Sequence, residues 1–188
     1  MTALPHHKMT ADEFLVWLDT QPREIGKLEL IDGIVMPQHR ERLTHSEIKL
    51  AAVLALRSAI IKAGVLCHAL VDGPVVRVRS TKVYKPDGLV YCGPRLPDDV
   101  TEINTPTILL EVISQRTAEV DFGDKLEGYF SLESVRHYVI LDPLRKCAIL
   151  HSRGTGDALA TRILQRDQTL RLDPPGIEIA LTDVFERE

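Results

Sequence analysis

Two apolar segments, Lys85-Pro86-Asp87-Gly88-Leu89-Val90-Tyr91 and Thr107-Ile108-Leu109-Leu110-Glu111-Val112-Ile113-Ser114, each carry one carboxylate. A third segment, Asp121-Phe122-Gly123-Asp124-Lys125, brings a lysine one helical turn after Asp121. Burying a carboxylate in an apolar strand costs free energy unless a cation or a hydrogen-bond donor pairs with it. We therefore expect the fold and its site to be arranged around Asp87 and Glu111.

The two carboxylates suggest a metal site. We expect their strands to lie side by side, with Asp87 and Glu111 at the same end of a sheet. Converging carboxylates repel each other unless a cation lies between them, and Mg²⁺ prefers oxygen ligands of this kind. Such an ion can contact a phosphate oxygen and lower the pKa of an attacking water, while Lys125 could stabilise the developing charge. The same residues also allow a simple turn aspartate and a glutamate that faces solvent or an arginine.

The first third of the chain predicts a short helix, a hairpin and a long helix. Thr10 and Glu13 have capping-box spacing at the start of the first helix. Asp32-Gly33 between two β-prone runs predicts a hairpin with a type I′ turn. The range 44–63 predicts the long helix, with Thr44 as its N-cap and apolar residues on more than one side.

The remaining pattern is several strands, a helix from about 121 to 132, and further strands. This order predicts an α+β (mixed α/β) fold with one main sheet. No G-x-G-x-x-G follows a strand and no G-x-x-x-x-G-K-[ST] is present, which excludes Rossmann and P-loop sites. The length of 188 residues predicts one domain over 1–188, with 1–8 as a flexible tail.

Composition narrows the class of protein. The hydrophobic fraction of 44% and the charged fraction of 27% are typical of soluble globular proteins. The sequence contains no run of 18 apolar residues, so we expect no membrane-spanning helix. The net charge of −4 does not favour a nucleic-acid partner, although a local basic patch can still bind nucleic acid. Cys67, Cys92 and Cys147 are widely spaced, odd in number and without a CxxC motif. That pattern fits a reducing compartment, predicts a cytoplasmic location and argues against a zinc knuckle.

Several motifs in a fixed order resemble the Uma-two family, restriction-endonuclease-like proteins of the PD-(D/E)xK nuclease superfamily and formerly a domain of unknown function. The motifs are Leu28-Glu29-Leu30-Ile31-Asp32-Gly33, His45 with Ile48, Pro86-Asp87, Leu110-Glu111-Val112-Ile113-Ser114, Thr117, Asp121, Lys125, Tyr129, Tyr138-Val139-Ile140-Leu141-Asp142-Pro143 and Leu181-Thr182-Asp183-Val184-Phe185. The resemblance covers roughly residues 8 to 186. It implies a restriction-endonuclease-like core, a central mixed sheet flanked by helices, here with an N-terminal helix and hairpin.

The resemblance also implies a catalytic site that hydrolyses DNA phosphodiester bonds with Mg²⁺ or Mn²⁺. Asp87 would be the acid of the PD element and Glu111 the acid of the (D/E)xK element. Both would bind the metal, and the main-chain carbonyl of Val112 would complete its shell. Ile113 occupies the position of the usual lysine. The resemblance therefore assigns the role of that lysine to Lys125, in the following helix.

Three further residues are secondary candidates. Asp121 lies one turn before Lys125 and either orients it or favours the helix N-terminus electrostatically. Glu29 is either an extra acid near the site or an exposed strand residue. His45, expected at the first position of the long helix, either contacts a phosphate or a metal-bound water or only hydrogen-bonds at the helix terminus.

Two functions remain open at this point. The first is the Mg²⁺-dependent DNA endonuclease that the resemblance implies. The resemblance also implies a homodimer, since nucleases of that superfamily often use two active sites to cut two strands. The second is a catalytically inactive nuclease-fold module that binds protein or nucleic acid, which the acidic net charge and Ile113 favour. A basic approach to a phosphate backbone, or only a solvated strand face, is predicted for Arg77, Arg79, Lys82 and Lys85.

Overall fold

The computed structural model describes residues 4–22, 25–38, 41–113, 123–156 and 158–185. In chain order the elements are α1 (Ala11–Asp19), β1 (Leu28–Ile31), β2 (Ile34–Pro37), α2 (Leu43–Ala63), β3 (Cys67–Val71), β4 (Val76–Arg79), β5 (Lys82–Tyr84), β6 (Gly88–Cys92), β7 (Pro106–Val112), α4 (Asp124–Phe130), β8 (His137–Asp142), β9 (Cys147–Arg153), β10 (Leu159–Gln165), β11 (Thr169–Leu172), β12 (Ile177–Ala180) and α5 (Thr182–Phe185). The α+β class predicted from the sequence is confirmed.

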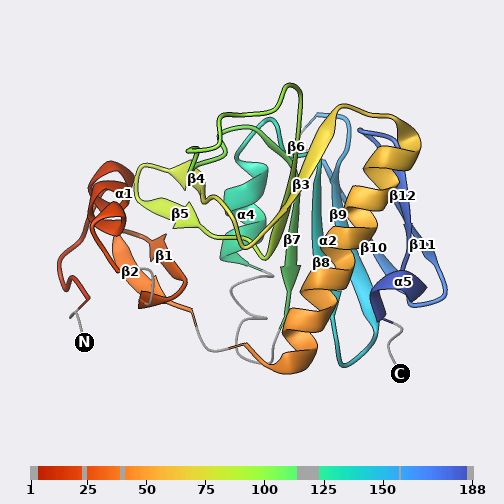
Figure 1. Ribbon diagram of the computed structural model, residues 1–188, viewed down its shortest axis with the longest axis horizontal. Coiled ribbons are helices and arrows are strands. Elements are labelled where there is room, and N and C mark those ends of the chain that lie inside the picture. The colour runs from red at the N-terminus through yellow and green to blue at the C-terminus, as the bar shows by residue number, and fades with distance from the viewer. Residues whose placement is uncertain (1–3, 23–24, 39–40, 114–122, 157, 186–188) are drawn as a thin grey trace.

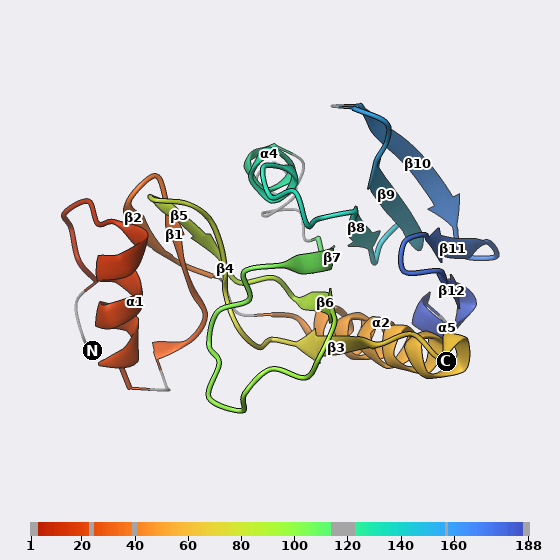
Figure 2. The same ribbon diagram turned by 90° about the horizontal axis from the view of Figure 1, so that it is seen from above.

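A six-stranded sheet forms the centre, in the order β10-β9-β8-β7-β6-β3. Strands β7 and β8 are parallel and the other neighbours are antiparallel, so the sheet is mixed. Helix α2 lies along one face of this sheet, and α4 lies on the opposite face (Figures 1 and 2). This is the predicted arrangement of a central mixed sheet between helices.

Strand β7 is buried on both faces because each face packs against a helix. Ile108 and Leu110 belong to the hydrophobic cluster that includes the inner face of α2. Leu109 belongs to the second cluster, with Tyr129 of α4. Successive side chains of a strand point to opposite faces, so Glu111 shares the α4 side with Leu109. The strand pattern therefore places the Glu111 carboxylate beneath α4.

The N-terminal part adds a second sheet, in the order β2-β1-β5-β4, and helix α1 (Figure 1). The Thr10 side chain accepts from the Glu13 N–H and the Glu13 carboxylate accepts from the Thr10 N–H, so the predicted capping box is confirmed. The hairpin is confirmed as well. Asp32 and Gly33 have φ angles of 50° and 83°, the left-handed values that a type I′ turn requires.

Some local predictions are wrong. Helix α2 begins at Leu43 rather than after Thr44, and its N-cap residue Arg42 makes no side-chain cap hydrogen bond. Instead the Glu41 carboxylate accepts from Ser46 of the first turn, at 3.1 Å. Strands β3 and β4 flank residues 72–74 but belong to different sheets, since β3 pairs with β6 and β4 with β5. Among the described helices, none has the length and apolar character needed to cross a membrane.

Candidate active site

Asp87 and Glu111 lie at the same end of neighbouring strands. Asp87 directly precedes β6, and the β6–β7 register pairs Gly88 with Leu110, which puts Asp87 opposite Glu111. Both carboxylate residues are only 3% exposed. The main-chain N–H of Val112 donates to Asp87 Oδ2 at 2.9 Å, so the Asp87 carboxylate is tied directly to the strand that carries Glu111. The expectation that these two strands lie side by side is confirmed.

Glu111 is held by two side chains of α4. Lys125 Nζ donates to Glu111 Oε1 at 2.7 Å, and the Tyr129 hydroxyl donates to the same oxygen at 2.9 Å. Lys125 and Tyr129 are four residues apart, so they share one face of the helix. Tyr129 was expected only as part of the family motifs, without a role in the site, so its hydrogen bond to Glu111 was missed. Helix α4 thus brings the lysine to the acid despite Ile113.

Glu29 joins this group from the N-terminal sheet. Its Oε1 lies 3.3 Å from Lys125 Nζ and accepts the main-chain N–H of Lys85 at 2.8 Å. Glu29 is 4% exposed, so it is not the exposed strand residue of the alternative interpretation. Lys125 therefore lies between two carboxylates, Glu29 and Glu111. Asp121, which the sequence suggested as a residue that orients Lys125, lies outside the described residues.

Asp87 has its own ammonium partner, which the sequence analysis missed. Lys27 Nζ donates to Asp87 Oδ1 at 2.7 Å. Lys27 precedes β1, two residues before Glu29, and residues two apart in an extended chain point to the same side. That spacing was the available signal once Glu29 had been identified as a candidate. Lys27 and Lys125 thus place one ammonium beside each of the two central carboxylates.

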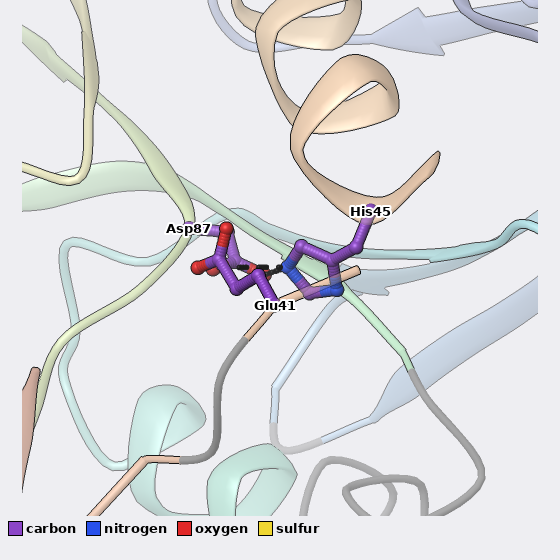
Figure 3. A group of neighbouring side chains, drawn as sticks. All are labelled: Glu41, His45 and Asp87. Carbon is purple, nitrogen blue, oxygen red and sulfur yellow. Dashed lines mark ion pairs between the residues drawn. The ribbon is translucent and has the colours of Figure 1, made fainter. Parts of the chain in front are cut away.

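His45 approaches Asp87 from the first turn of α2, and Glu41 lies beside it (Figure 3). His45 Nε2 is 3.2 Å from Asp87 Oδ2 and 3.9 Å from Glu41 Oε1. The nitrogen is buried and makes no hydrogen bond of acceptable geometry with any described residue. His45 is the third residue of the helix rather than the first, because α2 begins earlier than the sequence predicted.

A network of charged side chains surrounds Asp87. Lys49 Nζ contacts Glu41 at 2.6 Å and Asp72 at 2.7 Å, and Lys27 lies 3.5 Å from the same aspartate. Lys49 is 5% exposed, a degree of burial that a lysine rarely reaches without partners. Opposite charges therefore alternate from Glu41 through Lys49, Asp72 and Lys27 to Asp87.

Contacts within the site shift the pKa values of Asp87, Lys27 and Tyr129. Burial opposes ionisation of Asp87, but the adjacent His45 imidazole and the Lys27 ammonium outweigh it and hold the pKa of Asp87 well below its usual range. Burial likewise opposes the charge on Lys27, but Asp87 and then Glu111 raise its pKa. Burial and the nearby Glu111 charge raise the pKa of Tyr129, so its hydroxyl stays protonated and remains a donor.

The donor chemistry of the site fits a divalent cation. Glu41, His45 and Asp87 each offer one ligand atom, and these atoms lie within 4.8 Å of one another. Two carboxylates and one imidazole suit Mn²⁺ at least as well as Mg²⁺. His45 Nε2 is buried and has no hydrogen-bond partner among the described residues, so this nitrogen is available as a metal ligand. Glu111 is not one of these three residues, and its Oε1 accepts from Lys125 and Tyr129.

The basic residues of β4 and β5 are mostly neutralised. Arg77 Nε lies 3.0 Å from Glu102, and Lys82 Nζ lies 3.3 Å from Asp32. Arg79 pairs with the exposed Glu127 of α4. These ion pairs favour the solvated strand face over a free basic path for a phosphate backbone.

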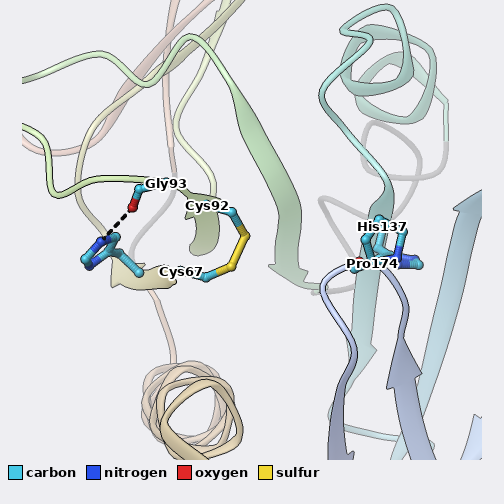
Figure 4. The surroundings of a disulfide bond; sticks show 6 residues. Cys67, Cys92, Gly93, His137 and Pro174 are labelled. Atoms are coloured by element: carbon cyan, nitrogen blue, oxygen red, sulfur yellow. Dashed lines mark hydrogen bonds between the residues drawn. A yellow bond between two sulfur atoms is a disulfide. The ribbon is translucent and has the colours of Figure 1, made fainter. Parts of the chain in front are cut away.

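Strand β6, which follows Asp87, is cross-linked to β3 at its other end. Cys67 and Cys92 form a disulfide, with their sulfur atoms 2.00 Å apart (Figure 4). The two residues are directly opposite in the antiparallel register, although 25 positions separate them in the chain. The disulfide runs counter to the reducing compartment inferred from wide cysteine spacing, because strand pairing brings distant residues together. Cys147 is a buried free thiol.

Comparisons with known proteins agree with this architecture. The model of the Uma2 family, described as "Putative restriction endonuclease", matches residues 11–182. A protein of Synechocystis sp. (strain ATCC 27184 / PCC 6803 / Kazusa), named "Uncharacterized protein slr1290", is 24% identical over 191 residues, which cover 96% of this chain and 93% of that protein. The crystal structure of "a putative nuclease belonging to DUF820" from Anabaena variabilis ATCC 29413 superposes with a TM-score of 0.72 at 16% identity, covering 94% of this chain and 97% of that one. That likeness shows the shared fold.

Proposed function

Because this chain belongs to the Uma2 family, which is described as "Putative restriction endonuclease", we propose that it is a metal-dependent endonuclease that hydrolyses DNA phosphodiester bonds. The observation that carries the proposal is the contact of Lys125 with Glu111. Nζ of Lys125 lies 2.7 Å from Oε1 of Glu111, so a lysine reaches the acid that Ile113 cannot serve. Two neighbouring buried acids can hold a metal ion, and a lysine beside them can stabilise negative charge that develops at a phosphate.

The proposed roles follow from the contacts. Asp87, Glu111 and the Val112 carbonyl would hold Mg²⁺ or Mn²⁺, with His45 and Glu41 as further potential ligands beside Asp87. When bound, the ion would supply positive charge at the phosphate and acidify a water molecule. Lys125 would hold positive charge near the phosphate while Glu29 and Glu111 fix its position. Tyr129 keeps the Glu111 carboxylate in place with its hydroxyl proton.

Plasmid cleavage with Mg²⁺ or Mn²⁺ tests the proposal. The informative variants are the near-isosteric Asp87→Asn and Glu111→Gln, together with Lys125→Met. We expect each to lose roughly 10²-fold or more in cleavage rate, the scale seen when one group that stabilises a transition state is removed. Glu133→Gln, in an exposed turn, is the matched control and should keep full activity. Equal cleavage by the wild type and all three site variants would remove this site from the reaction.

A catalytically inactive nuclease-fold module that binds protein or nucleic acid is the second candidate. One observation favours it, since each central carboxylate already has an ammonium partner, Lys27 for Asp87 and Lys125 for Glu111. A site neutralised in this way can be stable without a metal. Calorimetric titration with Mn²⁺ separates the two candidates. Binding that is lost in Asp87→Asn supports the nuclease, and no heat at millimolar Mn²⁺ supports the binding module.

The remaining proposals concern the setting of the reaction. We propose that 1–188 acts as a single domain, that the active form is a homodimer and that the protein works in the cytoplasm, where DNA is accessible. In a reducing compartment Cys67 and Cys92 would exchange between the disulfide and two thiols. Alkylation of cell lysates followed by mass spectrometry of the peptides carrying Cys67 and Cys92 measures that ratio. A fully oxidised pair would contradict the cytoplasmic location.

A further inference from the structure

Helix α2 carries an apolar stripe on the face that points away from the sheet. The exposed side chains are Leu43, Leu50, Leu54 and Ile61, which are 75%, 45%, 51% and 72% exposed. Their spacing of seven, four and seven residues is that of the a and d positions of a coiled coil. The apolar residues that the sequence placed on more than one side of this helix therefore divide into a buried face and an exposed stripe.

Nothing in the described part of the chain covers the stripe. Helix α2 lies across the front of the molecule in Figure 1 and at its outer edge in Figure 2, and no other described element crosses its outer side. The inner face is already filled, with Ala52 and Leu56 in the core cluster beneath it. Four large aliphatic side chains in one line on a single exposed helix face are unusual for a monomer.

The residues of the stripe are placed symmetrically in the sequence on either side of Ala52. Each apolar residue has an apolar counterpart at the same distance from Ala52, whereas the acidic residue has a basic counterpart. Leu50 and Leu54 are two residues from that centre, and Leu43 and Ile61 are nine residues from it. Glu47 and Arg57 are five residues from the centre on opposite sides. Both are exposed, and neither forms an ion pair with another described residue. They complete the heptad pattern at the two positions between the apolar pairs.

This symmetry identifies the occupant of the stripe, and we infer that α2 pairs antiparallel with α2 of a second copy of this chain. A two-fold axis at Ala52 would set Leu50 against Leu54 of the second copy and Leu43 against its Ile61. Glu47 would face Arg57 of the second copy, twice per interface. Such self-complementarity is the requirement of an isologous dimer contact, in which one patch binds its own copy. Parallel pairing would instead set Glu47 against Glu47 and Arg57 against Arg57.

The inference specifies the homodimer proposed above, although it does not depend on nuclease activity. His45 lies near the N-terminal end of α2, so antiparallel pairing would put the two candidate sites at opposite ends of the helix pair. The pair spans about 27 Å between Leu43 and Ile61 at 1.5 Å per residue. A failure to cleave DNA would leave the dimer contact intact. A monomer that cleaves DNA would refute this contact and the homodimeric active form, but not the nuclease activity.

Sedimentation of the full chain over a range of concentrations, with charge-reversed variants, tests the pairing. We expect a concentration-dependent dimer for the wild type and a dimer dissociation constant raised at least tenfold in Glu47→Arg and in Arg57→Glu. The double variant Glu47→Arg/Arg57→Glu should recover the wild-type dissociation constant. The two single variants change the net charge in opposite directions. A general effect of net charge would therefore shift their dimer dissociation constants in opposite directions. Glu133→Arg, an exposed turn residue away from α2, is the control for added charge and should dimerise as the wild type does.

Leu50→Glu/Leu54→Glu supplies an independent arm, since it removes the central apolar contact while the inner face of α2 is unchanged. It should be monomeric at every concentration, with the wild-type circular dichroism spectrum. A wild type that stays monomeric at high concentration would overturn the inference. So would a dimer that persists in Leu50→Glu/Leu54→Glu, and so would a double charge reversal that fails to restore pairing. If the stripe instead binds a different protein or a lipid surface, the wild type should stay monomeric at high concentration.

Discussion

Lys125 Nζ lies 2.7 Å from Glu111 Oε1, and both residues are 3% exposed. Fourteen positions separate them in the chain. The contact exists because β7 ends under α4 and presents Glu111 to the face of the helix that carries Lys125. A buried ion pair of this kind is costly to break from either side, since the remaining charge stays in a place that water does not reach.

Lys125→Met should therefore lower the free energy of unfolding by roughly 3–5 kcal/mol, the cost of leaving a buried charge without its partner. Urea unfolding followed by tryptophan fluorescence measures this change. The double variant Lys125→Met/Glu111→Leu should recover part of the loss, because it removes the stranded charge as well. Lys62→Met, at an exposed position of α2, is the control and should change stability by less than about 0.5 kcal/mol. A loss no larger than that of the control would mean that the pair is not buried in solution.

Asp87→Asn should flatten the dependence of stability on acid pH. The folded-state pKa of Asp87 lies below its ordinary value of 3.8, despite burial, because of His45 and Lys27. The stability that this depression contributes is complete above that ordinary value and is lost as the pH falls through the folded pKa. The wild type should thus lose stability more steeply than Asp87→Asn on acidification below about pH 4. Urea midpoints from pH 5 to pH 2 measure both slopes, and parallel curves would contradict the depressed pKa.

His45→Gln should weaken Mn²⁺ binding by roughly tenfold, the lower end of the cost of losing one metal-site partner. The reason is that His45 Nε2 is a buried nitrogen within reach of both Asp87 and Glu41. Isothermal titration with Mn²⁺ measures the affinity without any need for cleavage. His68→Gln is the control. The His68 ring nitrogen Nε2 hydrogen-bonds to the Gly93 carbonyl, which follows β6 at its disulfide-bonded end, away from Asp87. Unchanged affinity in His45→Gln would leave Asp87, Glu111 and the Val112 carbonyl as the metal-binding group.

Gly128→Ala should destabilise the protein even though alanine is the better helix former. A Cβ at this position would meet Cε2 of Tyr84 at 2.7 Å, and Tyr84 is fully buried. We expect a loss of about 1–3 kcal/mol, as for other overpacked sites. Thermal unfolding measures it, with the exposed neighbour Glu127→Ala as the control. A stabilised Gly128→Ala variant would mean that α4 packs more loosely over β5 than the structure has it.

The local elements were predictable because their signals lie within a few residues. Thr10 with Glu13 and Asp32 with Gly33 specify a capping box and a type I′ turn through hydrogen bonds and dihedral angles that need no distant partner. The start of α2 was predicted wrongly for the complementary reason. Thr44 has the chemistry of an N-cap, but the Glu41 carboxylate contacts Ser46 and Lys49 instead, and the contact with Lys49 belongs to a wider charge network.

The candidate site was predictable only in part. Asp87 and Glu111 stood out because a carboxylate in an apolar run demands an explanation, and the family resemblance added Lys125. Lys27 had only its spacing from Glu29 as a signal, and Tyr129 was a family motif residue without an assigned role, since a lysine before a strand and a tyrosine in a helix are common. Their roles follow from which residues face them across the sheet. The Cys67–Cys92 bond was hidden in the same way, because the register of β3 against β6 is set by the whole sheet.

The sequence by itself determined the α+β class, the capping box, the hairpin and the two carboxylates whose burial needed compensation. These depend on short-range geometry and on the cost of burying charge, both of which can be read along the chain. The tertiary structure alone decided which cations compensate those carboxylates, which cysteines meet and which side of α2 stays exposed. Those outcomes depend on contacts between residues distant in the chain, and a contact of that kind exists only after the sheet has set its strand order and register.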